Sequence, residues 1–213
     1  AETAGIELPK GMQARVRLYD ESGKLPLVGT PEDRWLLFFE EMGFEETEGK
    51  KLTESLLDWM DPDDEEREQG AETETYSQEE PPYRAPNRPL RNFRELRWVE
   101  GFRELFFDEN GVPNENFIVF QRNVSLHHTG DINLNTASEL VIETLAEERE
   151  FEADNVLDFL AGSDLQFGTE DDRILRPGLD EENLPMDDGG DPVTNNVQIR
   201  FLTAEIAVSS GQS

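Results

Sequence analysis

The sequence predicts an α+β fold in which both ends of the chain form strands and the middle forms helices. Residues 14–19 alternate polar and apolar side chains, and residues 197–208 alternate again, whereas helical spacing and helix caps lie between them. Strands and helices do not follow one another regularly, which argues against a succession of βαβ units. We therefore expect a β part built from residues 1–29 and 196–213, with an α-helical domain over residues 30–195 inserted into it.

The predicted β part begins with a strand over residues 14–19. The turn Asp20–Gly23 follows, and then a short second strand over Lys24–Val28. Near the other end, the apolar residues fall on odd positions up to Phe201 and on even positions from Ala204. A strand whose apolar phase switches in this way predicts a bulge or a bend.

The first predicted helix follows Thr30, which is a typical N-cap, and Pro31, which suits the first helical position. Gly43 is expected to end it. Its apolar residues recur at helical spacing: Trp35, Leu36, Phe38, Phe39 and Met42. A second helix is expected over about Lys50–Met60, stopping before Pro62.

Further helices are predicted from two motifs that resemble capping boxes. Asn92 and Glu95 open a helix that runs through Leu96 and Val99 and on toward Leu105. A second box, Thr136 with Glu139, precedes the apolar positions Leu140, Val141 and Leu145 and predicts a helix there. A last helix is expected over about Asp154–Ala161.

The composition limits the classes of partner. The 213 residues contain 19 Lys and Arg against 49 Asp and Glu, a formal charge of −30, which opposes binding to nucleic acid or to an anionic membrane. There is no Cys, so a disulfide framework and a thiolate zinc site are excluded. No apolar run is long enough to span a bilayer. The sequence starts at Ala1, and we expect it to be a trimmed or processed piece.

The densest acidic segment runs from Asp61 to Glu72. Asp61, Asp63 and Glu65 stand at positions 1, 3 and 5 of a twelve-residue stretch that Glu72 closes, the spacing at which an EF-hand type loop places calcium ligands. Position 6 is Glu66 rather than Gly, so the stretch is not an EF-hand. Two readings stay open on spacing alone: a calcium-binding loop and a solvated acidic loop.

A second acidic constellation spans residues 162–172. It combines short carboxylates with glycines, as calcium loops do when backbone carbonyls also serve as ligands; the candidates are Asp164, Thr169, Asp171 and Asp172. A helix C-cap that runs into a solvated turn is the alternative reading of the same residues.

Nothing in the sequence calls for catalysis, and we expect no enzyme. The two histidines, His127 and His128, are adjacent, so their side chains point apart on a regular element and rarely act on one centre. We expect both in a turn or at the surface. A phosphate-binding glycine loop, a zinc-protease motif and a dinucleotide fingerprint are all absent from the sequence.

Several segments together closely resemble general secretion pathway protein K, the family of minor pseudopilins of the type II secretion system. They occur in the family's order and spacing: Leu57–Asp63, Gly70–Glu72, Tyr76, Pro81–Asn87, Pro89–Leu90 and Arg94–Leu96. The resemblance extends to Asp20–Leu25, to Ile132–Ala137 and to the strand Ile199–Val208, and it covers nearly the whole chain. The family's N-terminal hydrophobic helix has no counterpart in this sequence.

The resemblance implies a pilin-like β part formed from both chain ends, with a large inserted SAM-like helical domain. It implies structural calcium, held by Asp61, Asp63 and Glu72 in the first loop and by Asp164, Thr169, Asp171 and Asp172 in the second. It further implies a non-catalytic role in protein export, at the tip of the periplasmic pseudopilus with minor pseudopilins I and J, and anchoring in the bacterial inner membrane through the N-terminal helix. Leu25–Val28 and the histidine pair depart from the family's pattern.

Two other classes of function remain as alternatives. Ile132–Ala137 also looks like the entry to a helix-hairpin-helix unit that binds nucleic acid, but no glycine-rich hairpin follows Leu145, and the net charge repels DNA. A secreted carboxylate-dependent hydrolase is the second alternative, although no particular pair of acids supports it.

Overall fold

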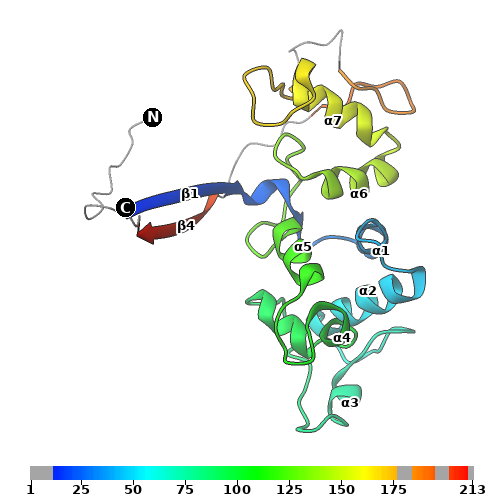
Figure 1. The fold of residues 1–213 in the computed structure, drawn as a ribbon. Helices are drawn as coiled ribbons and strands as arrows, with labels where there is room; N and C mark the ends of the chain where they lie inside the picture. The colour runs from blue at the N-terminus through cyan, green and yellow to red at the C-terminus, as the bar shows by residue number, and fades with distance from the viewer. Residues whose placement is uncertain (1–11, 177–183, 195–201, 211–213) are drawn as a thin grey trace.

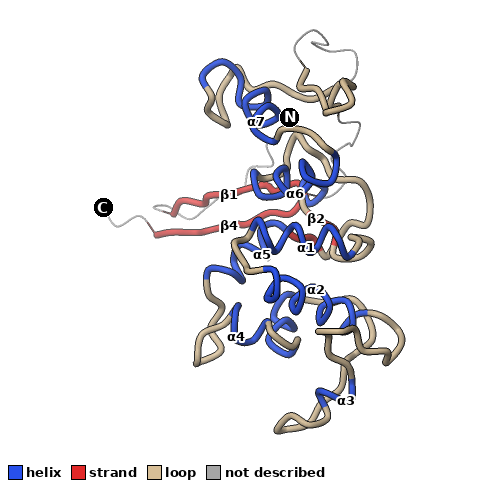
Figure 2. Tube along the Cα trace, turned by 90° about the vertical axis from the view of Figure 1, so that its right-hand side faces the viewer, coloured by secondary structure: helices blue, strands red, loops and turns tan. Residues whose placement is uncertain are grey.

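A two-stranded antiparallel ribbon projects from a body of helices (Figures 1 and 2). The structure is a computed structural model that describes residues 12–176, 184–194 and 202–210. In the ribbon, β1 (Met12–Asp20) pairs with β4 (Leu202–Ser210), from Met12 opposite Ser210 to Asp20 opposite Leu202. A strand from the first part of the chain and one from the last part therefore form one antiparallel pair. The pairing is one residue to one residue throughout residues 202–210, so the expected bulge is not found there, and residues 197–201 lie outside the described part.

The helical body follows β1 directly through the 3₁₀ turn η1 (Glu21–Gly23). Its helices are, in chain order, α1 (Glu32–Glu41), α2 (Glu46–Met60), α3 (Thr73–Tyr76), the 3₁₀ helix η2 (Phe93–Trp98), α4 (Phe102–Phe106), α5 (Glu115–Asn123), α6 (Glu139–Arg149), α7 (Ala153–Ala161) and the 3₁₀ turn η3 (Gly162–Asp164). A short parallel pair, β2 (Leu25–Pro26) with β3 (Val124–Ser125), ties the segment after the ribbon to the end of α5. No helix among the described residues is both long and apolar enough to cross a membrane.

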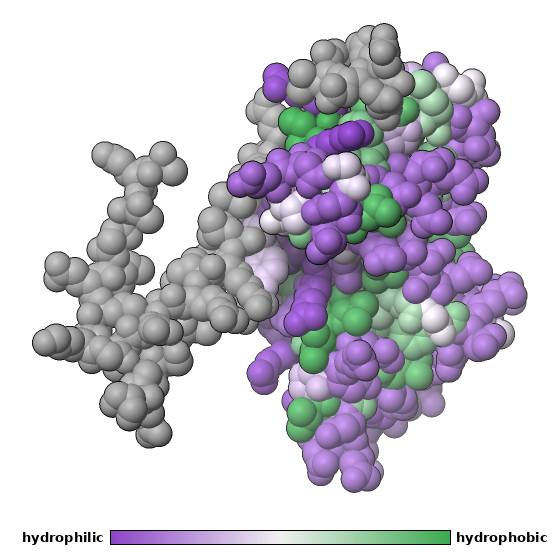
Figure 3. Space-filling view, turned by 45° about the horizontal axis from the view of Figure 1, so that its top comes forward, coloured by the Kyte–Doolittle hydropathy of each residue, from purple (hydrophilic) through white to green (hydrophobic). Residues whose placement is uncertain are grey.

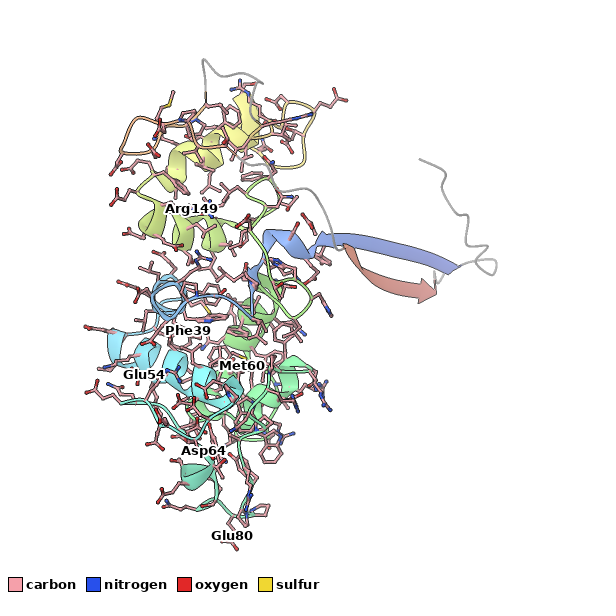
Figure 4. All side chains as sticks on the ribbon, turned by 180° about the vertical axis from the view of Figure 1, so that it is seen from behind. Phe39, Glu54, Met60, Asp64, Glu80 and Arg149 are labelled. Atoms are coloured by element: carbon pink, nitrogen blue, oxygen red, sulfur yellow. The ribbon has the colours of Figure 1, made fainter. Side chains whose placement is uncertain are left out.

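An aromatic cluster forms the centre of the helical body. The ring of Phe120 on α5 stacks on Trp35 and Phe39 of α1 at centroid distances of 5.9 and 6.1 Å, and Phe102 of α4 meets it edge-on. All four side chains are fully buried, and Phe39 lies inside the body in Figure 4. The apolar face predicted for the first helix is thus the core face, because residues three and four positions apart share one side of a helix.

Several predicted helix ends are wrong in detail. Thr30 does not cap α1; its hydroxyl donates to the Pro26 carbonyl at 2.6 Å, and Pro31 is the N-cap. Likewise, the N-cap of α6 is Ser138, because Thr136 is engaged elsewhere. Helix α2 begins earlier than expected, at a capping box formed by two glutamates, Glu45 and Glu48.

The helix expected from Asn92 through Val99 and on toward Leu105 is two elements rather than one. Asn92 caps as predicted and accepts a hydrogen bond from the Arg94 amide, but the helix that follows is the 3₁₀ helix η2. The chain then breaks at Gly101, whose φ of 80° an α-helix does not allow, and α4 starts after it. Helices α3 and α5 were not predicted from the sequence.

Hydrophilic residues cover most of the face seen in Figure 3, with small apolar areas between them. This surface agrees with the formal charge of −30 and with the low apolar fraction of 35%.

Candidate metal centre

Three acidic side chains of α2 and its C-cap face the same way. Glu54, Asp58 and Asp61 are four and three residues apart, a spacing that places them on one side of a helix. The Asp58 side chain is fully buried and that of Glu54 nearly so. Figure 4 shows Glu54 on α2 and the following acidic loop, with Asp64, running beside it toward the tip at Glu80. Since buried carboxylates are costly without partners, this face needs donors or a cation opposite it.

The loop after α2 returns along this face and brings a fourth acid into place. A Cβ on Gly70 would lie 1.9 Å from Oδ2 of Asp58, so only glycine allows the loop to pass this close. Two residues later comes Glu72. Oxygens of Asp58, Asp61 and Glu72 all lie within 4.8 Å of one another, the only such acidic group among the described residues.

Arg67 neutralises part of this group. Its Nη1 donates to Asp58 and, at 2.7 Å, to Asp61. The two carboxylates raise the pKa of Arg67 although its partial burial opposes this. Burial raises the pKa of Asp58, and the hydrogen bonds from Arg67 reduce that shift without cancelling it. One guanidinium therefore faces three carboxylates, which leaves the group short of positive charge.

Glu72 is the uncompensated member. It is 2% exposed, and neither of its oxygens has a hydrogen-bond partner among the described residues. Burial, followed by the charges of Asp58 and Asp61, raises the pKa of Glu72 to about 7. The Thr73 amide lies close enough to oppose this shift, but it is not aligned for a regular hydrogen bond. A buried carboxylate with no donor is the environment that a bound cation would relieve.

The structure brings together two of the three residues predicted for the first loop. Asp61 and Glu72 meet, whereas Asp63 is exposed and its Oδ1 accepts a hydrogen bond from the Glu65 amide. Asp58, the third member of the group, was not predicted from the sequence. Asp58 lies three residues before Asp61, a spacing that places both side chains on one side of a helix, and this could have identified it. The twelve-residue calcium-loop pattern begins at Asp61 and therefore does not include Asp58.

Asn87, from the proline-rich segment, borders the same loop. Its side-chain amide donates to the Asp63 carbonyl at 2.8 Å, while its buried Oδ1 has no partner among the described residues. Glu54, for its part, accepts the Gln69 amide at 2.5 Å and is therefore already occupied. The unpaired oxygens of this region belong to Asp61, Glu72 and Asn87.

All four residues predicted for the second loop meet around one atom, the hydroxyl oxygen of Thr169. It lies 2.8 Å from Oδ1 of Asp171, 3.3 Å from Oδ1 of Asp172 and 3.4 Å from Oδ1 of Asp164, with the Gln166 carbonyl at 3.2 Å. A hydroxyl donates only one hydrogen bond, so these oxygens outnumber the proton available to them. The loop gathers acceptors as a cation site does, at the protein surface.

Backbone geometry holds the second loop in shape. Asp171 Oδ2 accepts hydrogen bonds from the Ser163 amide, the Ser163 hydroxyl and the Asp164 amide, and these bonds lower the pKa of Asp171. Gly162 adopts a φ of 72°, and a Cβ there would come within 2.3 Å of the Asp171 carbonyl oxygen. Glycine is therefore required where α7 ends and the loop returns.

Of the two histidines, only His127 is exposed. His128 is buried, which corrects the expectation of a turn or surface position: its Nε2 lies 2.8 Å from the Lys24 carbonyl oxygen, and its Nδ1 accepts from the Gly130 amide at 3.4 Å. Both contacts are to backbone groups, so His128 holds two segments together.

Comparisons with known proteins point to one family. Residues 30–109 match the family model described as type II secretion system (T2SS), protein K. Type II secretion system protein K of Pseudomonas aeruginosa is 29% identical over 167 residues, which cover 72% of this chain and 46% of that protein. The Klebsiella pneumoniae protein of the same name is 35% identical over 82 residues, 38% of this chain and 24% of that protein. The chain thus spans less than half the length of these curated relatives.

The fold has a counterpart in a solved structure, the crystal structure of the GspK-GspI-GspJ complex from the enterotoxigenic Escherichia coli type 2 secretion system. A chain of that complex matches with a TM-score of 0.63 and 18% sequence identity, over 98% of this chain and 73% of that chain. At this identity the match concerns the fold alone. By sequence, the family model and the two relatives make this chain similar to type II secretion system protein K, most clearly over residues 30–109.

Proposed function

We propose that this chain is part of a minor pseudopilin, a non-catalytic component of the tip of the type II secretion pseudopilus. The sequence similarity to type II secretion system protein K carries the proposal, and the solved complex that shares the fold contains GspI and GspJ beside GspK. Minor pseudopilins I and J are accordingly the proposed partners. The helix-hairpin-helix and hydrolase alternatives gain no support from the comparisons.

The proposed setting is the periplasm, with anchoring in the inner membrane by the family's N-terminal hydrophobic helix. In this arrangement the β1–β4 ribbon is the pilin-like part, and the helical body is the inserted SAM-like domain with boundaries near residues 30 and 195. The acidic helical body would project away from the contacts, because a strongly charged surface is costly to bury between subunits.

Partner binding is tested by size-exclusion chromatography of this chain with the soluble parts of pseudopilins I and J, in the presence of calcium. A shared elution peak is expected. If no complex forms at high micromolar concentration, and secretion persists in cells that lack the gene, the assignment to the tip is refuted.

We also propose that calcium stabilises the fold. The observation that supports this proposal is the environment of Glu72, whose two carboxylate oxygens are buried and unpaired next to Asp58 and Asp61. Carboxylate oxygens are the ligands that calcium prefers, and Asp58, Asp61 and Glu72 would hold it in the first loop. Asp63, the third residue predicted there, would have to turn its exposed carboxylate away from the Glu65 amide to join them. In the second loop Asp164, Thr169, Asp171 and Asp172 would hold a second ion. Bound calcium would supply the positive charge that Arg67 alone does not.

A further inference from the structure

A cluster of arginines interrupts this acidic chain. Residues 84–103 contain six of the 19 basic residues and only two acidic ones. The preceding segment, residues 61–80, has the opposite balance, with many carboxylates and a single Arg. The two segments neutralise each other only in part: Arg103 reaches Glu79 at 3.5 Å. The remaining arginines need another explanation than internal charge balance.

Four of these arginines are exposed and take part in none of the ion pairs that the described residues form, and the last three lie close together in sequence, on η2 and just before it: Arg84, Arg91, Arg94 and Arg97. The two acids of the segment are occupied. Glu95 pairs with Arg88 at 3.0 Å, and Glu100 pairs with Lys51 at 2.7 Å. In a chain with 49 acidic residues, Arg91, Arg94 and Arg97 are therefore three neighbouring arginines without an ion-pair partner among the described residues, although Arg97 lines a pocket that also contains Glu104 and Asp108.

The 3₁₀ geometry of η2 sets the spacing of two of them. With three residues per turn, Arg94 and Arg97 lie one above the other, about 6 Å apart along the axis. Arg91 precedes the N-cap Asn92, and its backbone amide donates to Glu95 at 3.0 Å, which holds it beside the first turn. An extended strand places alternate side chains on one face about 6.6 Å apart, nearly the same distance.

Next to Arg97 in the sequence is an exposed aromatic side chain, Trp98. The Arg97 guanidinium lies over the Trp98 ring at 5.1 Å, and Trp98 is 42% exposed. The ring is fixed from below: it meets Tyr83 edge-on at 5.3 Å, and the Tyr83 hydroxyl donates to the Trp98 carbonyl at 2.9 Å. Tyr83 in turn stacks on the fully buried Tyr76. Trp and Arg are among the residue types that contribute most of the binding energy at interfaces.

We propose that Arg91, Arg94, Arg97 and Trp98, which we name the arginine surface, dock an extended acidic segment of a partner protein with carboxylates at alternate positions. Arg94 and Arg97 each receive one carboxylate, since the guanidinium fork matches a carboxylate and the spacing matches that of a strand. Trp98 covers an adjacent side chain of the segment. This surface lies outside the two proposed calcium loops and is independent of them.

The net charge of the chain favours a short acidic segment as the ligand over a second copy of the chain, a nucleic acid or an anionic lipid surface. A second copy carries the same formal charge of −30, so two copies repel each other. Nucleic acid and anionic lipid surfaces present long arrays of negative charge to the whole acidic body, which opposes their approach. A short acidic segment carries only a few negative charges, so it can contact the arginine surface with little repulsion from the rest of the acidic body.

The test uses a fluorescein-labelled peptide of alternating Glu and Thr, titrated with the full chain and followed by fluorescence polarisation. Binding is expected to weaken as salt is added, because exposed ion pairs are screened. A change in tryptophan emission is expected as well, since Trp35 and Trp59 are buried and Trp98 is the exposed one. The double substitution Arg94→Gln with Arg97→Gln should weaken binding about tenfold, the effect of losing two exposed ion pairs.

The matched control is Arg122→Gln, on α5, which removes an exposed arginine elsewhere and should leave binding unchanged. A peptide of the same composition with its Glu residues consecutive should bind more weakly, and one with Gln for Glu should not bind. The proposal is overturned by any of four results: equal binding by the consecutive-Glu peptide, unchanged binding by the double variant, displacement of the peptide by phosphatidylglycerol vesicles, or a dimer in light scattering that the double variant loses.

Discussion

Asp20 and Thr136 stand 116 residues apart in the chain and are joined by a hydrogen bond of 2.7 Å from the Thr136 hydroxyl to Oδ2 of Asp20. The same oxygen accepts from the Asn133 side-chain amide at 2.9 Å, and both carboxylate oxygens lie within reach of the Ser22 hydroxyl. Asp20 is the last residue of β1, so this network attaches the ribbon to the loop that precedes α6.

Substitution of Asp20 by Ala should destabilise the protein by about 2 kcal/mol, because it leaves several donors of the network without their charged acceptor. Urea unfolding measures the change. Asp33→Ala is the control, since Asp33 is exposed in the first turn of α1 and takes part in no such network among the described residues. Equal losses for both variants would show that the network contributes nothing specific.

The stabilisation from Asp20 should depend on pH in the acid range. Partial burial acts to raise the pKa of Asp20, but the hydrogen bonds from Ser22, Thr136 and Asn133 outweigh it, and the pKa lies below the usual 3.8. A carboxyl whose pKa is lowered on folding contributes stability above its unfolded pKa and loses it as the pH falls through the folded pKa. The difference in unfolding free energy between wild type and Asp20→Asn should therefore be constant at neutral pH and shrink below about pH 4. A difference that persists unchanged at pH 2 contradicts this.

Glu72→Gln should remove the response of the first loop to calcium. At a calcium concentration of one hundred times the dissociation constant, wild type should gain about 2.7 kcal/mol over the chelated protein, and the variant should gain less. In chelator the variant should be at least as stable as wild type, because it removes a buried charge without a partner. Thermal melts with EDTA and with calcium measure both effects.

Glu74→Gln is the matched control for Glu72, since Glu74 lies two residues further on and is exposed. It should keep the full response to calcium. Superimposed melts of wild-type protein with calcium and with EDTA would exclude a structural ion in the first loop.

Gly70→Ala should disturb the same centre from the backbone side. The added methyl group would meet Oδ2 of Asp58, so the loop must move away from α2, and we expect a loss of roughly 2 kcal/mol together with weaker calcium binding. Gly130→Ala is the control, because a Cβ at Gly130 meets no atom within 4 Å. Calorimetric titration and urea unfolding of the two variants separate the effects, and equal behaviour of both would refute the close approach.

Asp171→Asn should affect the second loop alone. It removes the charged acceptor of the Ser163 and Asp164 amides. In calorimetric titration the variant should bind one calcium ion fewer than wild type, and the ion that remains should be the one in the first loop, which Glu72→Gln removes. Glu170→Gln, a substitution of the exposed neighbour, should keep both equivalents. A single equivalent in wild type that Asp171→Asn does not change would remove the second site from the proposal.

The sequence by itself determined the features that depend on near neighbours. The alternation of residues 14–19 predicted β1, the apolar spacing from Trp35 to Met42 predicted the core face of α1, and Asn92 was correctly identified as a cap. These signals are local, because a strand face, a helix face and a cap each involve residues at most a few positions apart. The motifs between Leu57 and Leu96 likewise indicated the resemblance to protein K, to which residues 30–109 are similar.

The tertiary structure decided what each polar side chain does with its hydrogen bonds. Thr136 with Glu139 fits the capping-box pattern and Ser138 with Val141 does not, yet the distant Asp20 takes the Thr136 hydroxyl and Ser138 caps the helix. Asp58 and Glu72 become neighbours only because Gly70 lets the loop pass against α2. A polar group has several possible partners of similar energy, and only the packing of distant segments selects among them; a sequence pattern records the group but not the partner that the fold brings to it.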